Sequence, residues 1–184
     1  EADDVVIRYL RVRDVAEAAI AIQSAQRVVV DHCSATWSRG PALELKGGQG
    51  DVTLQWNLFA ETISDPDRPT VGVSIATDEG VYSVHHNYFA HHHAGSPYFA
   101  GRDTDPAPLL DLRHNVVYDW GNVSGDSGGE SGNYNIMGNV YKKGPSTEYE
   151  LSGKGFRFQS IGASIHAQNN ELVGSHMATG TNFL

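Results

Sequence analysis

The chain is poor in charged residues, in cysteine and in long apolar runs, and each shortage excludes a class of protein. Only 19% of its 184 residues are charged, which disfavours coiled coils and helical bundles. Cys33 is the single cysteine, so no disulfide can form within the chain. No apolar run approaches the roughly 18 residues that a membrane span needs. The net charge of −9 disfavours a nucleic-acid partner, because backbone phosphates would be repelled.

What the chain does have is 20 glycines and a repeated pattern of apolar residues. Seven segments share this pattern. Each begins with apolar residues that alternate with polar ones, and a small or polar residue and a further apolar residue follow. The alternation has a period of two, which is typical of strands rather than helices. The clearest segments are 52–59, 82–89, 110–117 and 134–141, and the others are 5–12, 28–35 and 165–172.

One position of the repeat is asparagine in five of the seven segments. It falls at residues 10, 33, 57, 87, 115, 139 and 170, with spacings of 23 to 31 residues. Such a period is typical of solenoids. We therefore predict one all-β domain over residues 1–184, a right-handed parallel β-helix of about seven coils in which the asparagines stack as a ladder. The alternative is a seven-stranded β-sandwich, which gives asparagine no reason to recur at one position.

Two longer intervals of the repeat predict loops. Residues 62–79 are rich in Asp, Pro and Thr, and residues 91–108 contain three prolines. Because excursions on one face of a solenoid commonly build its binding site, we expect these loops to flank a groove. The first strand should begin by Val5, without an N-terminal cap, and the exposed coil ends would then allow self-association.

Three segments resemble the pectate lyases. Residues 28–38 contain Asp31 and His32 and are similar to the Asp-His signature strand of that family, and residues 51–57 and 84–92 look like its next two coils. The similarity covers roughly residues 4–120. It implies a parallel β-helix, a secreted protein and β-elimination on an acidic polysaccharide such as pectate. In the mechanism of the family, Ca²⁺ held by carboxylates acidifies the C5 proton of the uronate, and an arginine removes it.

The chain diverges from the family at the calcium and arginine positions. The calcium aspartates, thirteen and fifteen positions before the signature Asp, correspond to Ala18 and Ala16. The next two acidic residues correspond to a position near Gly40 and to Glu44, so one carboxylate is kept where Ca²⁺ wants 6–8 oxygens. The Arg-x-Pro-x-x-Arg motif corresponds to residues 95–100, which keep the proline alone. We therefore expect the calcium site to be lost, and no cofactor is assigned.

Histidines are the next candidates. His114 shares the repeat position of His32 and His86, so one interpretation is a polar stack of these rings along the coils. The other interpretation is a metal site. Alternate residues of an extended segment point the same way, so His91 and His93 could ligate Zn²⁺ or Cu²⁺. Glu44 is the remaining metal candidate.

A metal-independent elimination would need a base and a cation. Tyr98 or a nearby histidine would be the base, and Arg102 or Lys46 would neutralise the uronate carboxylate. The alternative is that Tyr98 packs on the coil or stacks on sugar, and that Arg102 is a solvated charge or pairs with a neighbouring aspartate. The catalytic candidates are thus Tyr98, Arg102 and His93, and the substrate-binding candidates are His91, His92, Glu44 and Lys46.

Two functions stay open. The first is an atypical lyase or binding protein for an extracellular, uronate-type polysaccharide. The second is a non-catalytic structural, adhesive or carbohydrate-binding solenoid, which the missing acids and arginines favour. A chain with a charge of −9 needs a local positive patch to bind an acidic glycan. Protonation of residues 91–93 below about pH 6.5 would supply it, so affinity should rise as pH falls.

Overall fold

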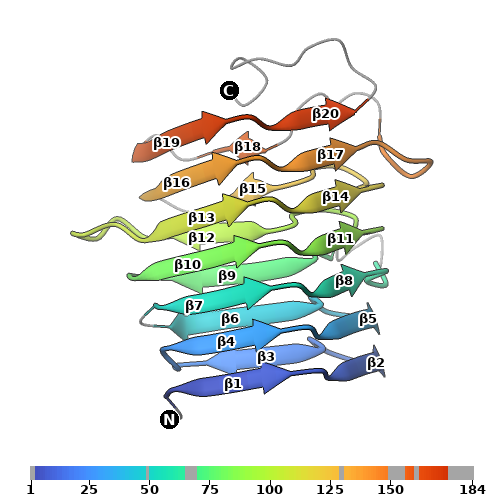
Figure 1. The fold of residues 1–184 in the computed structure, drawn as a ribbon, viewed down its shortest axis with the longest axis horizontal. Helices are drawn as coiled ribbons and strands as arrows, with labels where there is room; N and C mark the ends of the chain where they lie inside the picture. The colour runs from blue at the N-terminus through green and yellow to red at the C-terminus, as the bar shows by residue number, and fades with distance from the viewer. Residues whose placement is uncertain are drawn as a thin grey trace.

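The computed structural model describes residues 3–48, 50–64, 70–128, 131–148, 156–159 and 162–173. These residues form twenty strands. The strands wind around one axis, coil upon coil, from the N-terminus at one end to the last strand at the other (Figure 1). Neighbouring strands pair in parallel throughout. The chain is therefore a right-handed parallel β-helix, and the β-sandwich alternative is wrong. In the described part, no helix is long and apolar enough to cross a membrane.

Each of the three sheets takes every third strand, so every full coil contributes one strand to each sheet. Sheet A contains β1 (Val5–Arg8), β4 (Val28–Asp31), β7 (Val52–Gln55), β10 (Val81–His85), β13 (Leu109–Arg113), β16 (Ser131–Met137) and β19 (Gly162–Gln168). Sheet B contains β2 (Arg11–Val15), β5 (Ser34–Ser38), β8 (Leu58–Ala60), β11 (Tyr88–Ala90), β14 (Val116–Tyr118), β17 (Val140–Lys142) and β20 (Glu171–Val173). Sheet C contains β3 (Ile20–Gln23), β6 (Leu43–Gly48), β9 (Val73–Thr77), β12 (Tyr98–Gly101), β15 (Asp126–Ser127) and β18 (Arg157–Phe158).

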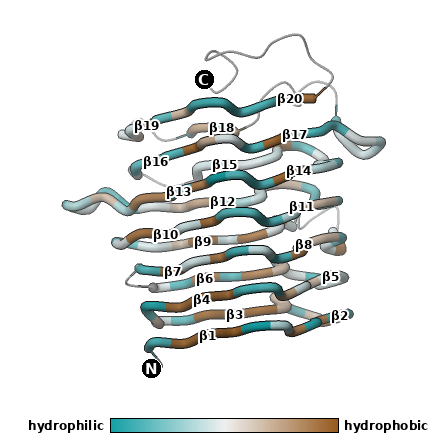
Figure 2. The backbone as a smooth tube through the Cα atoms, in the orientation of Figure 1, coloured by the Kyte–Doolittle hydropathy of each residue, from teal (hydrophilic) through white to brown (hydrophobic). Residues whose placement is uncertain are grey.

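The core consists of files of equivalent inward residues from successive coils. Figure 2 shows hydrophobic and hydrophilic positions alternating along the strands, as the period of two requires. Two files that the repeat predicts are confirmed by the strand register. The file in sheet A is Leu54, Val84, Leu112 and Ile136, and the file in sheet B is Phe59, Phe89, Val117 and Tyr141. Every member is at most 2% exposed, so each coil buries its apolar residues against the next.

Asparagines link the coils at the corner where sheet A turns into sheet B. The side-chain oxygen of Asn57 accepts from the backbone N–H of Cys33 at 2.9 Å. Its side-chain nitrogen donates to the carbonyl of Val30 at 2.9 Å and to the side-chain oxygen of Asn87 at 3.0 Å. Equivalent bonds continue through Asn115, Asn139 and Asn170. The ladder therefore satisfies buried backbone groups that each turn would otherwise leave unpaired.

The residue before each ladder position has a left-handed backbone. The aromatic rings at this position form a column on the surface. The column runs through Tyr9, His32, Trp56, His86 and His114, with neighbouring centroids 4.5 to 6.3 Å apart. It ends at Gly138, where a Cβ would come 2.7 Å from the His114 ring. The polar stack predicted for the three histidines is confirmed, with Trp56 between the first two.

The two intervals predicted as loops each contain a strand of sheet C. β9 lies within residues 62–79 and β12 within residues 91–108, so only the segments around these strands are loops. Residues 65–69 of the first interval lie outside the described part. The repeat pattern missed these strands because it followed the segments that cross the A-to-B corner. The strands of sheet C also alternate, but no asparagine marks their position.

The ladder predicts a large effect for a single amide. Asn87→Ala removes the acceptor of the Asn57 backbone N–H and the donor to the Leu54 carbonyl, both buried. We expect a loss of about 2–5 kcal/mol in the free energy of unfolding. Urea denaturation measures this free energy of unfolding. The control is Gln23→Ala at an exposed position, which should change stability by less than about 0.5 kcal/mol. Equal stability of the two variants would show that the ladder does not hold the coils.

Candidate functional site

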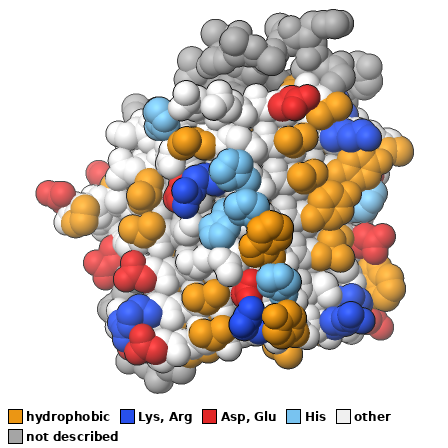
Figure 3. Space-filling model, viewed as in Figure 1, with side chains coloured by type: hydrophobic (Ala, Val, Ile, Leu, Met, Phe, Trp, Pro, Cys, Tyr) orange, Lys and Arg blue, Asp and Glu red, His pale blue; other side chains and the backbone are white. Residues whose placement is uncertain are grey.

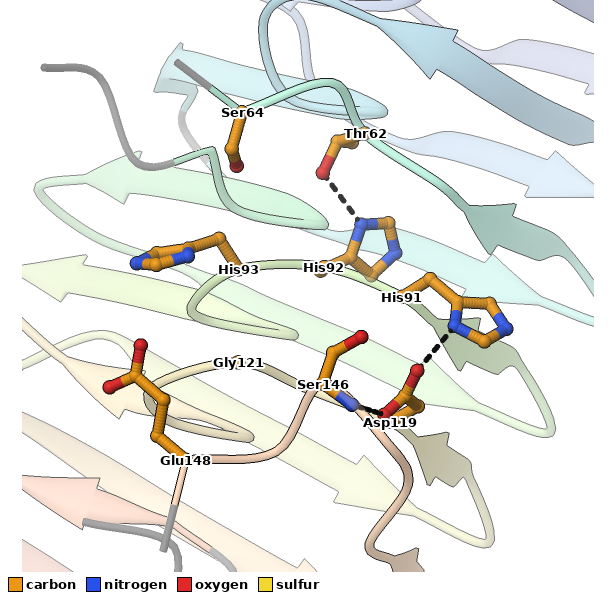
Figure 4. A pocket seen from close by; sticks show the side chains of 9 residues that line it. All are labelled: Thr62, Ser64, His91, His92, His93, Asp119, Gly121, Ser146 and Glu148. Atoms are coloured by element: carbon orange, nitrogen blue, oxygen red, sulfur yellow. Dashed lines mark hydrogen bonds and ion pairs between the residues drawn. The ribbon is translucent and has the colours of Figure 1, made fainter. Parts of the chain in front are cut away.

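A pocket of about 210 Å³ opens at the corner where sheet B turns into sheet C (Figure 4). It lies in the turns that follow β8, β11, β14 and β17, so four successive coils place their side chains next to one another. All three histidines of the 91–93 run line it. The full lining is Thr62, Ser64, His91, His92, His93, Asp119, Gly121, Ser146 and Glu148.

His91 is held by a buried carboxylate at one side of the pocket. Its Nδ1 donates to Oδ2 of Asp119 at 2.7 Å, and the Asp119 side chain is 2% exposed. The other carboxylate oxygen accepts from the backbone N–H of Ser146 at 2.6 Å. Because Asp119 fixes the Nδ1 side of the ring, Nε2 of His91 is left as an acceptor on a ring that is 41% exposed. This arrangement can take up a proton from a bound molecule.

His92 is turned into the protein. Its Nε2 donates to the Phe59 carbonyl at 2.9 Å, so Nδ1 accepts from the Thr62 hydroxyl at 2.9 Å. Burial lowers the pKa of His92 to about 4. His92 therefore stays neutral at pH 6.5, where an ordinary histidine takes up its proton. The expectation that all three histidines charge together is wrong for this residue, and its two ring bonds support the corner rather than a ligand.

His93 lies on the far side of the pocket, with Glu148 (Figure 4). Gly121 sits beside it, and a Cβ there would come 2.9 Å from the His93 carbonyl oxygen. His91 and His93 point in opposite directions in Figure 4, because the left-handed backbone of His91, with a φ of 56°, breaks the extended geometry. The premise of the two-histidine metal site therefore does not hold. Within the described ranges, no three His, Cys, Asp or Glu side chains are grouped for a metal ion.

The outer face of sheet C carries Tyr98, Glu44 and Lys46. The turns that line the pocket lead into the strands of this sheet. Glu44, Ser74 and Tyr98 occupy equivalent outward positions of β6, β9 and β12. The Tyr98 hydroxyl lies where a side chain at position 128 would project, so Gly128 leaves it room. Lys46 Nζ lies 2.8 Å from Oε1 of Glu44, so this cation is already paired.

Arg102 lies apart from the other candidates. It follows β12 at the end opposite to Tyr98, which at about 3.3 Å per residue separates the two by roughly 13 Å. Its Nε is 3.0 Å from Oδ1 of Asp78, and both side chains are exposed. An exposed ion pair of this kind contributes about 0–1 kcal/mol. The structure thus places Arg102 in a surface pair with Asp78 and does not bring it to the histidine pocket.

The Asp-His pair that carries the family resemblance lies on the outer face of sheet A. Asp31 accepts from His32 at 2.6 Å, from Arg8 at 2.6 Å and from Gln55 at 3.1 Å. Burial opposes ionisation, but these three hydrogen bonds lower the pKa of Asp31 below its ordinary value. The carboxylate therefore joins three successive coils.

The sequence reading missed Asp119, although the repeat could have found it. Adjacent coils here are offset by 28 residues, the interval from Asn87 to Asn115. Adding this offset to His91 gives Asp119, and both residues have a left-handed backbone after their sheet B strands. Applying the register to the corner after sheet B, and not only to the asparagines, reveals the dyad.

The residues at the family's calcium positions do not fit calcium. Ala16 and Ala18 offer no side-chain oxygen, and Glu44 is paired with Lys46. At Gly40 a Cβ would come 2.9 Å from backbone atoms of the neighbouring coil, so a carboxylate has no room there. These positions therefore lack the several carboxylates that a calcium ion needs.

Comparison with known proteins finds curated relatives. Probable pectate lyase C from Aspergillus terreus is 31% identical over 163 residues, that from Neosartorya fischeri 30%, and that from Aspergillus fumigatus 29%. Each alignment covers 84% of this chain and 36% of the relative. The chain thus spans about a third of the length of these relatives. No protein-family model matches the chain. No solved structure matches it.

The buried His92 predicts a loss of stability in acid. The unfolded chain binds a proton at the ordinary pKa of 6.5, whereas folded His92 does so only at about 4. Stability is therefore lost as pH falls through this window, by about 3 kcal/mol for this residue. Urea unfolding at both ends of the window should show a steeper loss for the wild type than for His92→Gln. If the free energy of unfolding falls equally with pH in the two proteins, burial does not lower the pKa of His92.

The calcium positions predict a flat response to the metal. In calorimetric titration with Ca²⁺, the wild type and Glu44→Gln should give the same trace, without a saturable transition. The reason is that Glu44 is the one carboxylate kept from the family's calcium positions and is already paired with Lys46. Tight binding that is lost in Glu44→Gln would contradict this.

Proposed function

Because the chain is a pectate-lyase-like parallel β-helix, we propose that it binds a uronate-type polysaccharide outside the cell and acts on it by β-elimination. The polymer runs over the outer face of sheet C and the adjoining histidine pocket. The observation that carries the proposal is the His91–Asp119 dyad, which presents a free imidazole nitrogen at the edge of this pocket. The similarity to probable pectate lyases over 84% of the chain supports the substrate class.

The elimination requires a base and a proton donor. In the proposed step, Nε2 of His91 takes the C5 proton of the uronate, and the electron pair of that bond forms the double bond between C4 and C5. The bond from C4 to the glycosidic oxygen breaks, and this oxygen takes a proton from His93 or from the Tyr98 hydroxyl. Buried Asp119 stabilises the protonated ring of His91, as a carboxylate does for an imidazole base.

A second candidate function is non-catalytic binding of the same polymer. The observation that favours it is the pairing of the predicted cations, since Lys46 contacts Glu44 and Arg102 contacts Asp78. A uronate carboxylate would have to compete with these acidic partners. In this case the dyad contributes a hydrogen bond to the sugar and no proton transfer.

Self-association through the coil ends also stays a proposal. β1, β2 and β3 are outer strands of their sheets in the described part. An outer strand presents unpaired N–H and C=O groups that can pair with a second copy. Sedimentation at increasing concentration should then show dimers, and a concentration-independent monomer would overturn it.

Turnover and binding of polygalacturonate distinguish the two functions. Elimination creates a conjugated double bond that absorbs in the ultraviolet, whereas binding does not. We expect absorbance to rise with the wild type and to stay flat with His91→Ala, which should still bind. Binding without any absorbance change would favour the second candidate, and the absence of both would overturn the proposal.

Tyr98 should contribute to the affinity for the polymer. Removing a ring that stacks on sugar costs about 1 kcal/mol or more, so Tyr98→Ala should weaken binding by about tenfold. The control is Tyr9→Ala, which removes a tyrosine that is 67% exposed on the opposite side of sheet B. Equal affinities of the two variants would place the polymer elsewhere.

A further inference from the structure

The outer face of sheet B carries a row of exposed apolar side chains. Leu58, Tyr88 and Val116 are equivalent residues of β8, β11 and β14, and they are 37%, 40% and 37% exposed. Figure 3 shows hydrophobic side chains gathered over this sheet, with basic and histidine side chains at their border. A row of this kind does not pack in the core, so its side chains are open to contact from outside the molecule.

At the border of this row, Lys142 and His91 lie on the coils on either side of one tyrosine, Tyr118. Tyr118 and Lys142 are equivalent residues at the ends of β14 and β17. Lys142 Nζ lies 5.8 Å from the centre of the Tyr118 ring. The His91 ring stands edge-on to the same ring, with centroids 5.3 Å apart and planes at 82°. Three coils thus contribute an ammonium group, a phenol ring and an imidazole to one small area.

Lys142 differs from the cations of the sheet C face. Lys46 is paired with Glu44, and Arg157 with Asp126. No ion pair of Lys142 occurs among the described residues, and its side chain is exposed. In a chain with a net charge of −9, an exposed ammonium group beside an aromatic ring is a local site for an anion.

We propose that His91, Tyr118 and Lys142 form a subsite for one carboxylate-bearing sugar. This inference rests on the proposed function and adds a contact surface on sheet B to the path over sheet C. The ammonium group of Lys142 pairs with the sugar carboxylate, and the Tyr118 ring packs against the C–H bonds of the sugar. The His91 ring borders this sugar through its edge contact with Tyr118, and its Nε2 stays available for the proton transfer proposed above.

The dimensions of the row favour a sugar chain over a protein partner. Three coils spaced about 4.8 Å apart make the row of Leu58, Tyr88 and Val116 roughly 10 Å long. The row takes one outward position of each strand, with Tyr118 beside it on β14, and this small area is far below the roughly 800 Å² per partner of a stable protein interface. A short oligosaccharide fits this shape, and its charge complements Lys142.

The subsite is tested by binding of a galacturonate oligomer and of the same oligomer with its carboxylates methyl-esterified. Lys142→Met should weaken binding of the acidic oligomer by about tenfold or more and leave the esterified oligomer unchanged, because only the ion pair is lost. Tyr118→Leu should weaken both. The matched control is Arg39→Gln, which removes one exposed positive charge from another coil and should change neither affinity by more than about twofold.

The outcomes separate the subsite from the proposed function. If Lys142→Met and Arg39→Gln behave alike while Tyr98→Ala loses affinity, the subsite is wrong and the path over sheet C stands. If Lys142→Met weakens both oligomers equally, the carboxylate contact is wrong. If the wild type binds neither oligomer, the proposed function itself fails. Thermal unfolding of each variant shows that a lost affinity does not reflect a lost fold.

Discussion

The position of every functional side chain depends on the hydrogen bonds between successive asparagines at the A-to-B corner. Each side-chain amide bonds the backbone of the preceding coil and the side-chain amide of the next coil. These bonds fix the register in which successive coils pair. A slip of one residue would move inward side chains to the surface. With the register fixed, residues that are 23 to 31 positions apart in the chain become neighbours, and the outer surface becomes a set of ordered rows.

The histidine pocket and the sheet B row are both consequences of this register. His91 meets Asp119 because they are one coil apart, and Tyr118 meets Lys142 for the same reason. The fold therefore builds an acid-base pair and an anion site from residues with no local motif between them. The same rule gives the column of Tyr9, His32, Trp56, His86 and His114, in which the rings are stacked on both sides of Trp56 and tilted at both ends.

Sequence alone predicted the solenoid, its ladder and two of its inward files, because burial and the asparagine position repeat with a constant period. It did not predict the strands of sheet C, which lack such a marker. It paired His91 with His93 by extended-strand geometry, and the left-handed backbone at His91 reverses that geometry. The pairing of Lys46 with Glu44 and the burial of His92 depend on side-chain positions in three dimensions, which a linear pattern does not contain.

In the proposed function, a uronate chain contacts the molecule at His91. The most direct measurement is a heteronuclear NMR titration of the imidazole rings with a galacturonate oligomer. The His91 signals should shift and saturate, while those of buried His92 and of His32 in the surface column stay in place. Shifts confined to the column, with the His91 signals unmoved, would show that the uronate chain binds there and not at His91.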